Sequence, residues 1–180
     1  MKQFASLSLS CLTLVVFLAA CRTSQPATSG GSPPVAGSSP APIFSSLDVV
    51  KVKPDSVAIT VGGNADASVF LAISPGFHVN ANPATFPYLI ATELEVGNGD
   101  GMITAGKPVY PVAQTRRFKF AEQPLAVYED EVKLTLPLRA MPKAKKGSVS
   151  LPISVMVQAC DEEKCYPPGR LNATIPVEVK

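Results

Sequence analysis

The sequence predicts an all-β fold, and three observations support this prediction. Segments with alternating apolar and polar residues, or with many β-branched residues, recur from Leu47 onward. Short turns rich in glycine, proline, asparagine and aspartate separate them. No stretch keeps a helical period, and prolines such as Pro83, Pro108 and Pro124 would interrupt a helix. We therefore expect an immunoglobulin-like β-sandwich of about seven to nine short strands in two packed sheets.

Residues 1–20 are expected to form a lipoprotein signal peptide. An apolar stretch from about Leu7 to Ala20 follows Lys2 and is too short to span a bilayer as a stable helix. It ends in Leu-Ala-Ala before Cys21, which resembles the lipobox at which bacterial lipoprotein signals are cut. The resemblance implies that Cys21 becomes the first mature residue and carries lipid, and several acyl chains anchor a protein stably. An ordinary signal peptide that ends at a cysteine is the alternative.

Export and lipidation also predict the location and the state of the cysteines. Arg22, rather than an acidic residue, follows Cys21, which implies sorting to the outer membrane of a double-membraned bacterium. We expect a lipid-anchored protein on the periplasmic face of a bacterial membrane. Of the four cysteines, Cys11 leaves with the signal and Cys21 carries lipid, so only Cys160 and Cys165 remain as thiols. An exported location is oxidising, which favours a disulfide between these two.

Residues 21–46 are expected to form the lipidated end and a flexible tether. Serine, proline, glycine, threonine and alanine dominate, with almost no large apolar residue before Ile43. Such a segment cannot bury enough apolar surface to offset the entropy of ordering. Removal of Lys2 leaves fifteen of the sixteen basic residues against fourteen acidic ones, a balance that argues against nucleic acid as a partner. Residues 47–180 are numerous enough for one domain with its own core.

Six segments of this domain carry the strand signal most clearly. In residues 131–138, for example, valine and leucine alternate with lysine, threonine and proline, which predicts one buried face. The expected strands are residues 48–53, 56–61, 67–73, 131–138, 148–157 and 173–179. Pro137 and Pro152 fall inside strands and are expected at sheet edges or bulges.

The strongest local signal surrounds the two remaining cysteines. An apolar strand runs into Cys160, four charged residues follow, and Cys165 leads into Tyr166 and two prolines. This pattern places the cysteines on either side of a hairpin-like loop, where they can approach disulfide distance. A loop this short gains only about 2 kcal/mol from the chain-entropy effect of a disulfide, so stapling alone is a modest reason for it.

The segment from Gln158 to Pro168 resembles the C-terminal signature of the N-terminal periplasmic domain of the thiol:disulfide interchange protein DsbD. Further similar segments are residues 74–83, 88–94, 125–130 and 134–138, so the resemblance covers most of residues 47–180. It implies an immunoglobulin-like sandwich in which Cys160 and Cys165 are the redox pair. It also implies that this pair takes electrons from a thioredoxin-like domain and passes them to exported thioredoxin-fold proteins.

The same resemblance implies an aromatic shield over the cysteine pair. The family's cap loop falls on residues 116–120 of this sequence, which makes Phe118 or Phe120 the shielding ring. Two features depart from the family. Arg116 and Arg117 replace the acidic residues expected before the cap aromatic, which bears on partner choice, and the loop between the cysteines is one residue shorter. The 180 residues contain no membrane-embedded or thioredoxin-like part, so we expect electrons to arrive in trans.

Other chemistries find less support in the residues. His78 is the only histidine and is expected to be a loop or core residue, and with the cysteines paired no zinc set remains. We therefore expect no metal and no cofactor. The three acidic residues that follow Cys160 disfavour its thiolate, and Lys164, beside Cys165, partly offsets their effect. The pair is therefore better suited to being attacked by another thiolate than to attacking unaided. The alternative to a redox relay is a non-catalytic immunoglobulin-like binding lipoprotein whose disulfide is structural.

Overall fold

The computed structural model describes residues 44–97 and 101–180. They belong to a compact unit, Pro40–Lys180, whereas the other unit, Met1–Ser39, lies outside the described residues. The expected signal peptide, Cys21 and most of the expected tether therefore lie outside them as well. Across the described part, no helix is long and apolar enough to cross a membrane.

The structure confirms the all-β, immunoglobulin-like prediction. The described residues contain twelve strands and one short 3-10 helix, η1 (Ser46–Asp48). The number of strands is higher than the expected seven to nine, because several strands of only two to four residues carry no clear signal in the sequence. The strands are β1 (Val50–Pro54), β2 (Val57–Ile59), β3 (Asn64–Ile73), β4 (His78–Asn80), β5 (Glu93–Val96), β6 (Ile103–Ala105), β7 (Gln114–Arg116), β8 (Leu125–Tyr128), β9 (Glu131–Ala140), β10 (Gly147–Val157), β11 (Ala159–Cys160) and β12 (Gly169–Val179).

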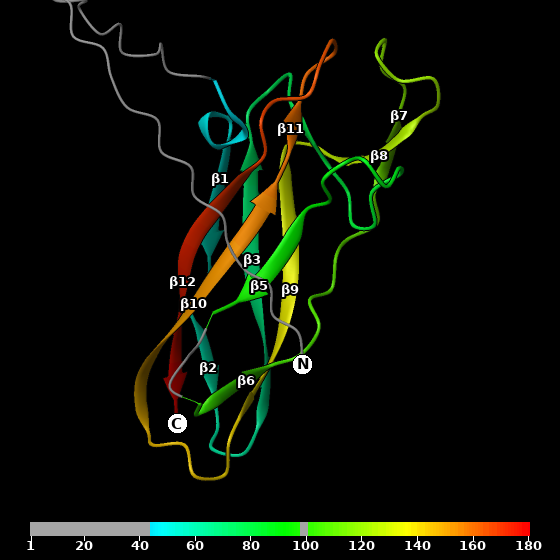
Figure 1. Ribbon diagram of the computed structural model, residues 1–180. Coiled ribbons are helices and arrows are strands. Elements are labelled where there is room, and N and C mark those ends of the chain that lie inside the picture. Colours follow the sequence, from blue (N-terminus) through cyan, green and yellow to red (C-terminus); the bar gives the residue numbers. More distant parts are fainter. Residues whose placement is uncertain (1–43, 98–100) are drawn as a thin grey trace, which may run out of the picture. The chain divides into compact units, whose positions relative to one another are not determined.

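Two four-stranded sheets form the sandwich (Figure 1). One has the order β1-β3-β9-β6 and the other the order β2-β12-β10-β5, and all neighbours are antiparallel except β2 and β12. Apolar residues alternate with polar ones along the long strands, and the apolar side chains of both sheets join one buried cluster. Its members from β9 and β10 are Val132, Leu134, Leu136, Leu138, Ala140, Leu151, Ile153, Val155 and Val157.

Pro137 and Pro152 lie in interior strands, so the expectation that they mark edges or bulges is wrong. β9 lies between β3 and β6, and β10 lies between β12 and β5. Each proline is placed where the short neighbouring strand has ended. There Gly106 N–H donates to Pro137 O over 2.8 Å, and Gly97 N–H donates to Pro152 O over 2.9 Å. On that side the regular pairing is interrupted beside each proline, because β5 ends at Val96 and β6 ends at Ala105. Pairing with β9 resumes only at the bridge between Val109 and Thr135, so neither missing proline N–H breaks a continuous ladder.

A third sheet, of order β11-β4-β8-β7, lies at the end of the sandwich toward which β10 runs (Figure 1). All three residues of β4 are buried, so the strand lacks the alternation by which the longer strands are recognised. β11 follows β10 after a single residue, Gln158, and carries Cys160 into this sheet. The third sheet therefore positions the predicted redox pair.

Candidate functional site

A disulfide joins Cys160 and Cys165 and closes a narrow hairpin after β11. The two cysteines face each other as an isolated antiparallel bridge, and Tyr166 N–H donates to Ala159 O over 2.8 Å beside them. Cys160 is fully buried, whereas Cys165 is partly exposed. A reagent that approaches from solvent therefore has access to Cys165 and not to Cys160.

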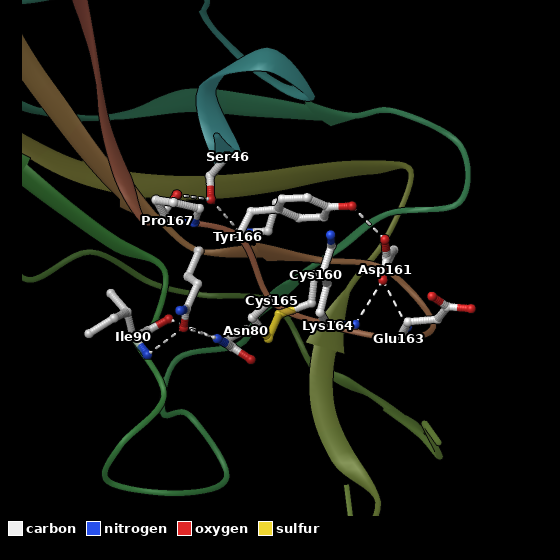
Figure 2. Close-up of a disulfide and its surroundings, with 12 residues drawn as sticks. Ser46, Asn80, Ile90, Cys160, Asp161, Glu163, Lys164, Cys165, Tyr166 and Pro167 are labelled. Carbon is white, nitrogen blue, oxygen red and sulfur yellow. Dashed lines mark hydrogen bonds between the residues drawn. A yellow bond between two sulfur atoms is a disulfide. The ribbon is translucent and has the colours of Figure 1, made fainter. Parts of the chain in front are cut away.

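Asp161 organises the turn between the cysteines. Its Oδ1 accepts hydrogen bonds from Glu163 N–H over 2.8 Å and Lys164 N–H over 2.9 Å. Its Oδ2 accepts the Tyr166 hydroxyl over 2.6 Å (Figure 2). The Tyr166 hydroxyl, followed by the two backbone N–H groups, lowers the pKa of Asp161 to about 2, while the same bond raises the pKa of Tyr166. The carboxylate is therefore ionised at neutral pH and holds both the tip and the exit of the turn.

The residues at the start of the described chain support this hairpin. Ser46 is fully buried, and its Oγ donates to Pro167 O over 2.7 Å and accepts from Ala159 N–H over 2.8 Å (Figure 2). The Phe44 ring meets the Tyr166 ring edge-on with a centroid distance of 4.8 Å. Ser46 belongs to the expected tether, yet its side chain bonds to both arms of the cysteine hairpin.

Two amide side chains tie the hairpin to the loop after β4. Gln158 Oε1 accepts hydrogen bonds from Asn80 Nδ2 and from Ile90 N–H, each over 3.1 Å. Asn80 is fully buried and also donates from Nδ2 to Ile90 O over 3.1 Å (Figure 2). These bonds fix the loop that carries Tyr88 and Leu89 against the strand that leads into the disulfide.

Cys165 opens onto a hollow of about 300 Å³. The other lining residues are Tyr88, Leu89, Phe120, Ala121, Leu125 and Gln158. Tyr88 is 74% exposed and Phe120 is 37% exposed, so apolar surface surrounds the accessible sulfur. An exposed apolar patch of this kind is typical of a site at which another protein docks.

The two aromatic residues of the expected cap loop take different places. Phe118 is only 4% exposed, and its ring stacks on the imidazole of His78 with a centroid distance of 3.9 Å. Phe120 lies 5.5 Å from Phe118 between ring centroids and lines the same hollow as Cys165. Phe118 is therefore placed to anchor the segment, and Phe120 is the candidate that lies beside the accessible cysteine.

His78 lies directly opposite Cys160 in the pairing of β4 with β11. Its side chain is 2% exposed, and burial lowers its pKa to about 4. The imidazole is therefore neutral at neutral pH. Over residues 44–97 and 101–180, no group of three or more histidine, cysteine, aspartate or glutamate side chains is placed to hold a metal ion.

The structure brings three of the expected site residues together, namely Cys160, Cys165 and Phe120. Phe118 contacts Phe120 but does not line the hollow beside Cys165. Cys21 is outside the described residues. Sequence reasoning missed the supporting roles of several residues. They are Ser46, His78, Asn80, Gln158 and, as a turn organiser, Asp161. A usable signal existed for Asp161, because aspartate at the start of a short turn commonly bonds to the backbone two residues later.

Comparison with known proteins identifies a family but no close relative. The family model described as "Thiol:disulfide interchange protein DsbD, N-terminal" matches residues 49–175, which is more than half of the chain. No curated protein matches the sequence. The similar solved structures include the reduced DsbD N-terminal domain of Neisseria meningitidis, with 16% identity, a TM-score of 0.38 and coverage of 66% of this chain and 82% of that one.

Two further solved structures are similar at low identity. The N-terminal periplasmic domain of ScsB from Proteus mirabilis has 12% identity and a TM-score of 0.48, over 73% of this chain and 47% of that one. CaCohA2 from Clostridium acetobutylicum has 9% identity and a TM-score of 0.43, over 73% of this chain and 91% of that one. The family assignment therefore rests on the sequence match over residues 49–175.

Proposed function

Because this chain belongs to the family of N-terminal domains of the thiol:disulfide interchange protein DsbD, we propose that Cys160 and Cys165 form its redox-active pair. The pair cycles between disulfide and dithiol and relays reducing equivalents to exported thioredoxin-fold proteins. The observation that carries the proposal is the disulfide itself, which lies within the matched residues and offers one partly exposed sulfur beside an apolar hollow.

The difference in exposure between Cys160 and Cys165 supports one order of exchange. A thiolate of the electron donor attacks Cys165 Sγ, the bond between the two cysteines breaks, and Cys160 leaves as a thiolate. The donor's second thiolate then attacks the donor sulfur of the mixed disulfide, so that Cys165 leaves and the donor becomes oxidised. The domain has gained two electrons and, with two protons from solvent, holds a dithiol. The same steps in reverse reduce an acceptor disulfide.

Phe120 is the proposed shield of this pair, and Phe118 holds the shield in place. Phe120 lines the hollow through which Cys165 is reached, while Phe118 is buried beneath it. A partner that docks on the hollow would displace Phe120 and fill the apolar surface with its own side chains. In the absence of a partner, the ring limits the access of small oxidants and reductants.

Charges of the expected cap loop, residues 116–120, bear on which partner docks. Arg116 Nε donates to Glu129 Oε1 over 3.0 Å, so one of the two arginines of the cap segment is paired within the domain. Arg117 and Lys119 are exposed beside it. A partner with acidic residues around its own cysteines would complement this edge, since opposite charges speed encounter.

The chain is proposed to act on the periplasmic face of a bacterial membrane. Residues 1–20 would be the lipoprotein signal, Cys21 the lipidated residue, and residues 22–43 the tether that lets the domain reach its partners. The tether is proposed to end before Phe44 and Ser46, because both side chains contact the cysteine hairpin. The expected result of Cys21→Ser is loss of covalently bound fatty acid from the chain. Fatty acid still bound to the Cys21→Ser variant would refute the anchor and leave the redox proposal standing.

Trapping of a mixed disulfide tests the redox proposal. The Cys160→Ala variant keeps the accessible Cys165 without its internal partner, so a thioredoxin-fold protein with a Cys-x-x-Cys motif should accumulate on it as a mixed disulfide. The Cys165→Ala variant is the matched control, because it keeps only the buried Cys160 and should trap much less. Equal absence of adducts in both variants would favour a structural disulfide in a non-catalytic binding module.

A further inference from the structure

His78 and Cys160 share one face of the third sheet. The two residues are directly opposed in the antiparallel pairing of β4 with β11. Directly opposed residues project their side chains to the same side, with Cβ atoms roughly 4.5 to 5.5 Å apart. The imidazole therefore lies within reach of the cysteine sulfur that departs when the disulfide opens.

The imidazole of His78 has an unused nitrogen in the oxidised protein. Among the described residues, His78 Nε2 and Asn80 Oδ1 are the buried side-chain polar atoms without a hydrogen-bond partner. Asn80 is nevertheless held through its amide nitrogen, which bonds to Ile90 and Gln158. A buried polar atom left unpaired costs free energy, so native structures keep few of them, and they are often found at sites of chemistry.

The surroundings of His78 favour a neutral ring. Burial lowers the pKa of His78 to about 4, the Asp161 carboxylate opposes this shift, and the Arg116 guanidinium adds to it. A second hollow, distinct from the one beside Cys165, is lined by His78 and Arg116, and the other charged groups around it are Glu129, Asp130 and Glu162. The ring plane is covered by Phe118, which keeps water from that face. A neutral imidazole carries one N–H and can donate a hydrogen bond without placing a second charge in a buried site.

We propose that His78 donates Nε2–H to Cys160 Sγ whenever the disulfide is open, and thereby stabilises the buried thiolate that takes part in exchange. This inference rests on the proposed redox function and adds a residue to it. While the disulfide is closed, Cys160 Sγ is held by Cys165 and Nε2 stays without a partner. Once the bond is broken, rotation about the Cα–Cβ bond of Cys160 brings its sulfur toward the ring.

The role of His78 is defined for each direction of exchange. When the domain reduces an acceptor, Cys165 is joined to the acceptor, and the Cys160 thiolate attacks Cys165 Sγ. The disulfide reforms and the acceptor leaves as a thiolate, so the electron pair of Cys160 forms the new bond and no proton moves to or from His78. When the domain is reduced, Cys160 leaves as a thiolate and receives the same hydrogen bond. In both directions His78 stabilises the negative charge on Cys160 and does not act on Cys165.

A two-phase reaction separates the two cysteines. The full chain with Cys11→Ser and Cys21→Ser is reduced and mixed with a chromogenic aromatic disulfide. The first phase, whose rate rises with reagent concentration, joins the reagent to Cys165 and releases one coloured thiolate. The second phase is intramolecular and independent of reagent concentration, because Cys160 attacks Cys165 and releases the other coloured thiolate.

Two substitutions of His78 distinguish a hydrogen-bond donor from a packing residue. His78→Phe keeps a ring to stack on Phe118 but has no N–H, whereas His78→Gln replaces the ring with an amide that can donate. We expect His78→Phe to slow the second phase about tenfold or more at neutral pH, because hydrogen bonds to charged groups are the stronger ones. In His78→Phe, the pH at which the second-phase rate begins to rise should also be higher than in the parent chain, because the Cys160 thiolate is less stabilised. We expect His78→Gln to restore most of the rate.

The first phase is the internal control, since its rate should stay within about twofold of the parent in both variants and reports an intact hairpin. An unchanged second phase in His78→Phe would overturn the proposal, and so would a His78→Gln variant as slow as His78→Phe. Neither result depends on a protein partner. Failure of the relay would instead appear as the absence of trapped thioredoxin-fold proteins, with both phases of this reaction intact.

Discussion

The contact between Ser46 and the cysteine hairpin leads to a quantitative prediction for Ser46→Ala. The serine Oγ is fully buried, accepts from Ala159 N–H over 2.8 Å and donates to Pro167 O over 2.7 Å. Alanine removes both bonds. Pro167 O keeps the Ser46 backbone N–H at 3.1 Å, so the main cost is the lost acceptor of the buried Ala159 N–H. Loss of a partner by one buried donor costs about 1 to 3 kcal/mol.

We therefore expect Ser46→Ala to lower the free energy of unfolding of the oxidised chain by about 2 kcal/mol. For a domain of this size, this corresponds to a fall in melting temperature of roughly 6 to 10 °C. Urea unfolding followed by circular dichroism is the assay, and the midpoint should fall while the slope stays constant.

Ser148→Ala is the matched control for this prediction. Ser148 Oγ bonds to an exposed carboxylate, that of Glu178, over 2.6 Å, and its removal should change stability by less than about 0.5 kcal/mol. If Ser46→Ala were no more destabilising than Ser148→Ala, the reasoning that η1 supports the cysteine hairpin would be refuted.

Three further predictions follow from the site. Phe120→Ala should speed reduction of the disulfide by a small thiol severalfold. Phe118→Ala should mainly lower the free energy of unfolding, by about 3 to 5 kcal/mol, as for other buried phenylalanines. Equal reduction rates for Phe120→Ala and the parent chain would remove the shield assignment. His78 is the only histidine, so its imidazole NMR resonances are unique, and they should titrate near pH 4 rather than 6.5. Because the pKa of His78 is lowered in the folded protein, the free energy of unfolding should fall as the pH drops from 6.5 through about 4. This pH dependence should be absent in His78→Phe. The pKa of Asp161 is also lowered in the folded protein, from 3.8 to about 2, so its stabilisation of the turn is present above pH 3.8 and lost as the pH falls through about 2. In acid unfolding, the Asp161→Asn variant should lack this loss of stability between pH 3.8 and about 2.

The long strands could be predicted from the sequence because each has one buried and one exposed face. β9 and β10 show this most clearly, since their burial alternates residue by residue over most of their length. The short strands of the third sheet could not be predicted in the same way. β4 is buried at all three positions and β7 is exposed at all three, so neither carries a period of two.

The candidate site was predictable where its residues are close in the sequence. Cys160 and Cys165 are five residues apart, and the elimination of the other two cysteines left them as the only pair. The contacts of Ser46 span more than 110 residues, and no local pattern indicates them. The sequence indicates a loop or core residue at His78, because a lone histidine lacks metal partners, and only the register of β4 against β11 places it opposite Cys160.

The difference between Phe118 and Phe120 has the same origin. Both rings lie in residues 116–120, the segment expected to form the cap loop, and the sequence offers no reason to prefer one. The stack of Phe118 on His78 buries the first ring and leaves the second beside Cys165. A long-range contact thus gives different surroundings to two residues that are equivalent in the local sequence.

The reduction potential of the Cys160–Cys165 pair is the most direct test of the central claim. The full chain with Cys11→Ser and Cys21→Ser is equilibrated with redox buffers of known potential, and the ratio of disulfide to dithiol is measured after acid quenching and thiol alkylation. The account predicts a potential above about −300 mV, in the range of proteins that exchange disulfides with their partners. A potential well below about −300 mV, as in structural disulfides, would contradict it.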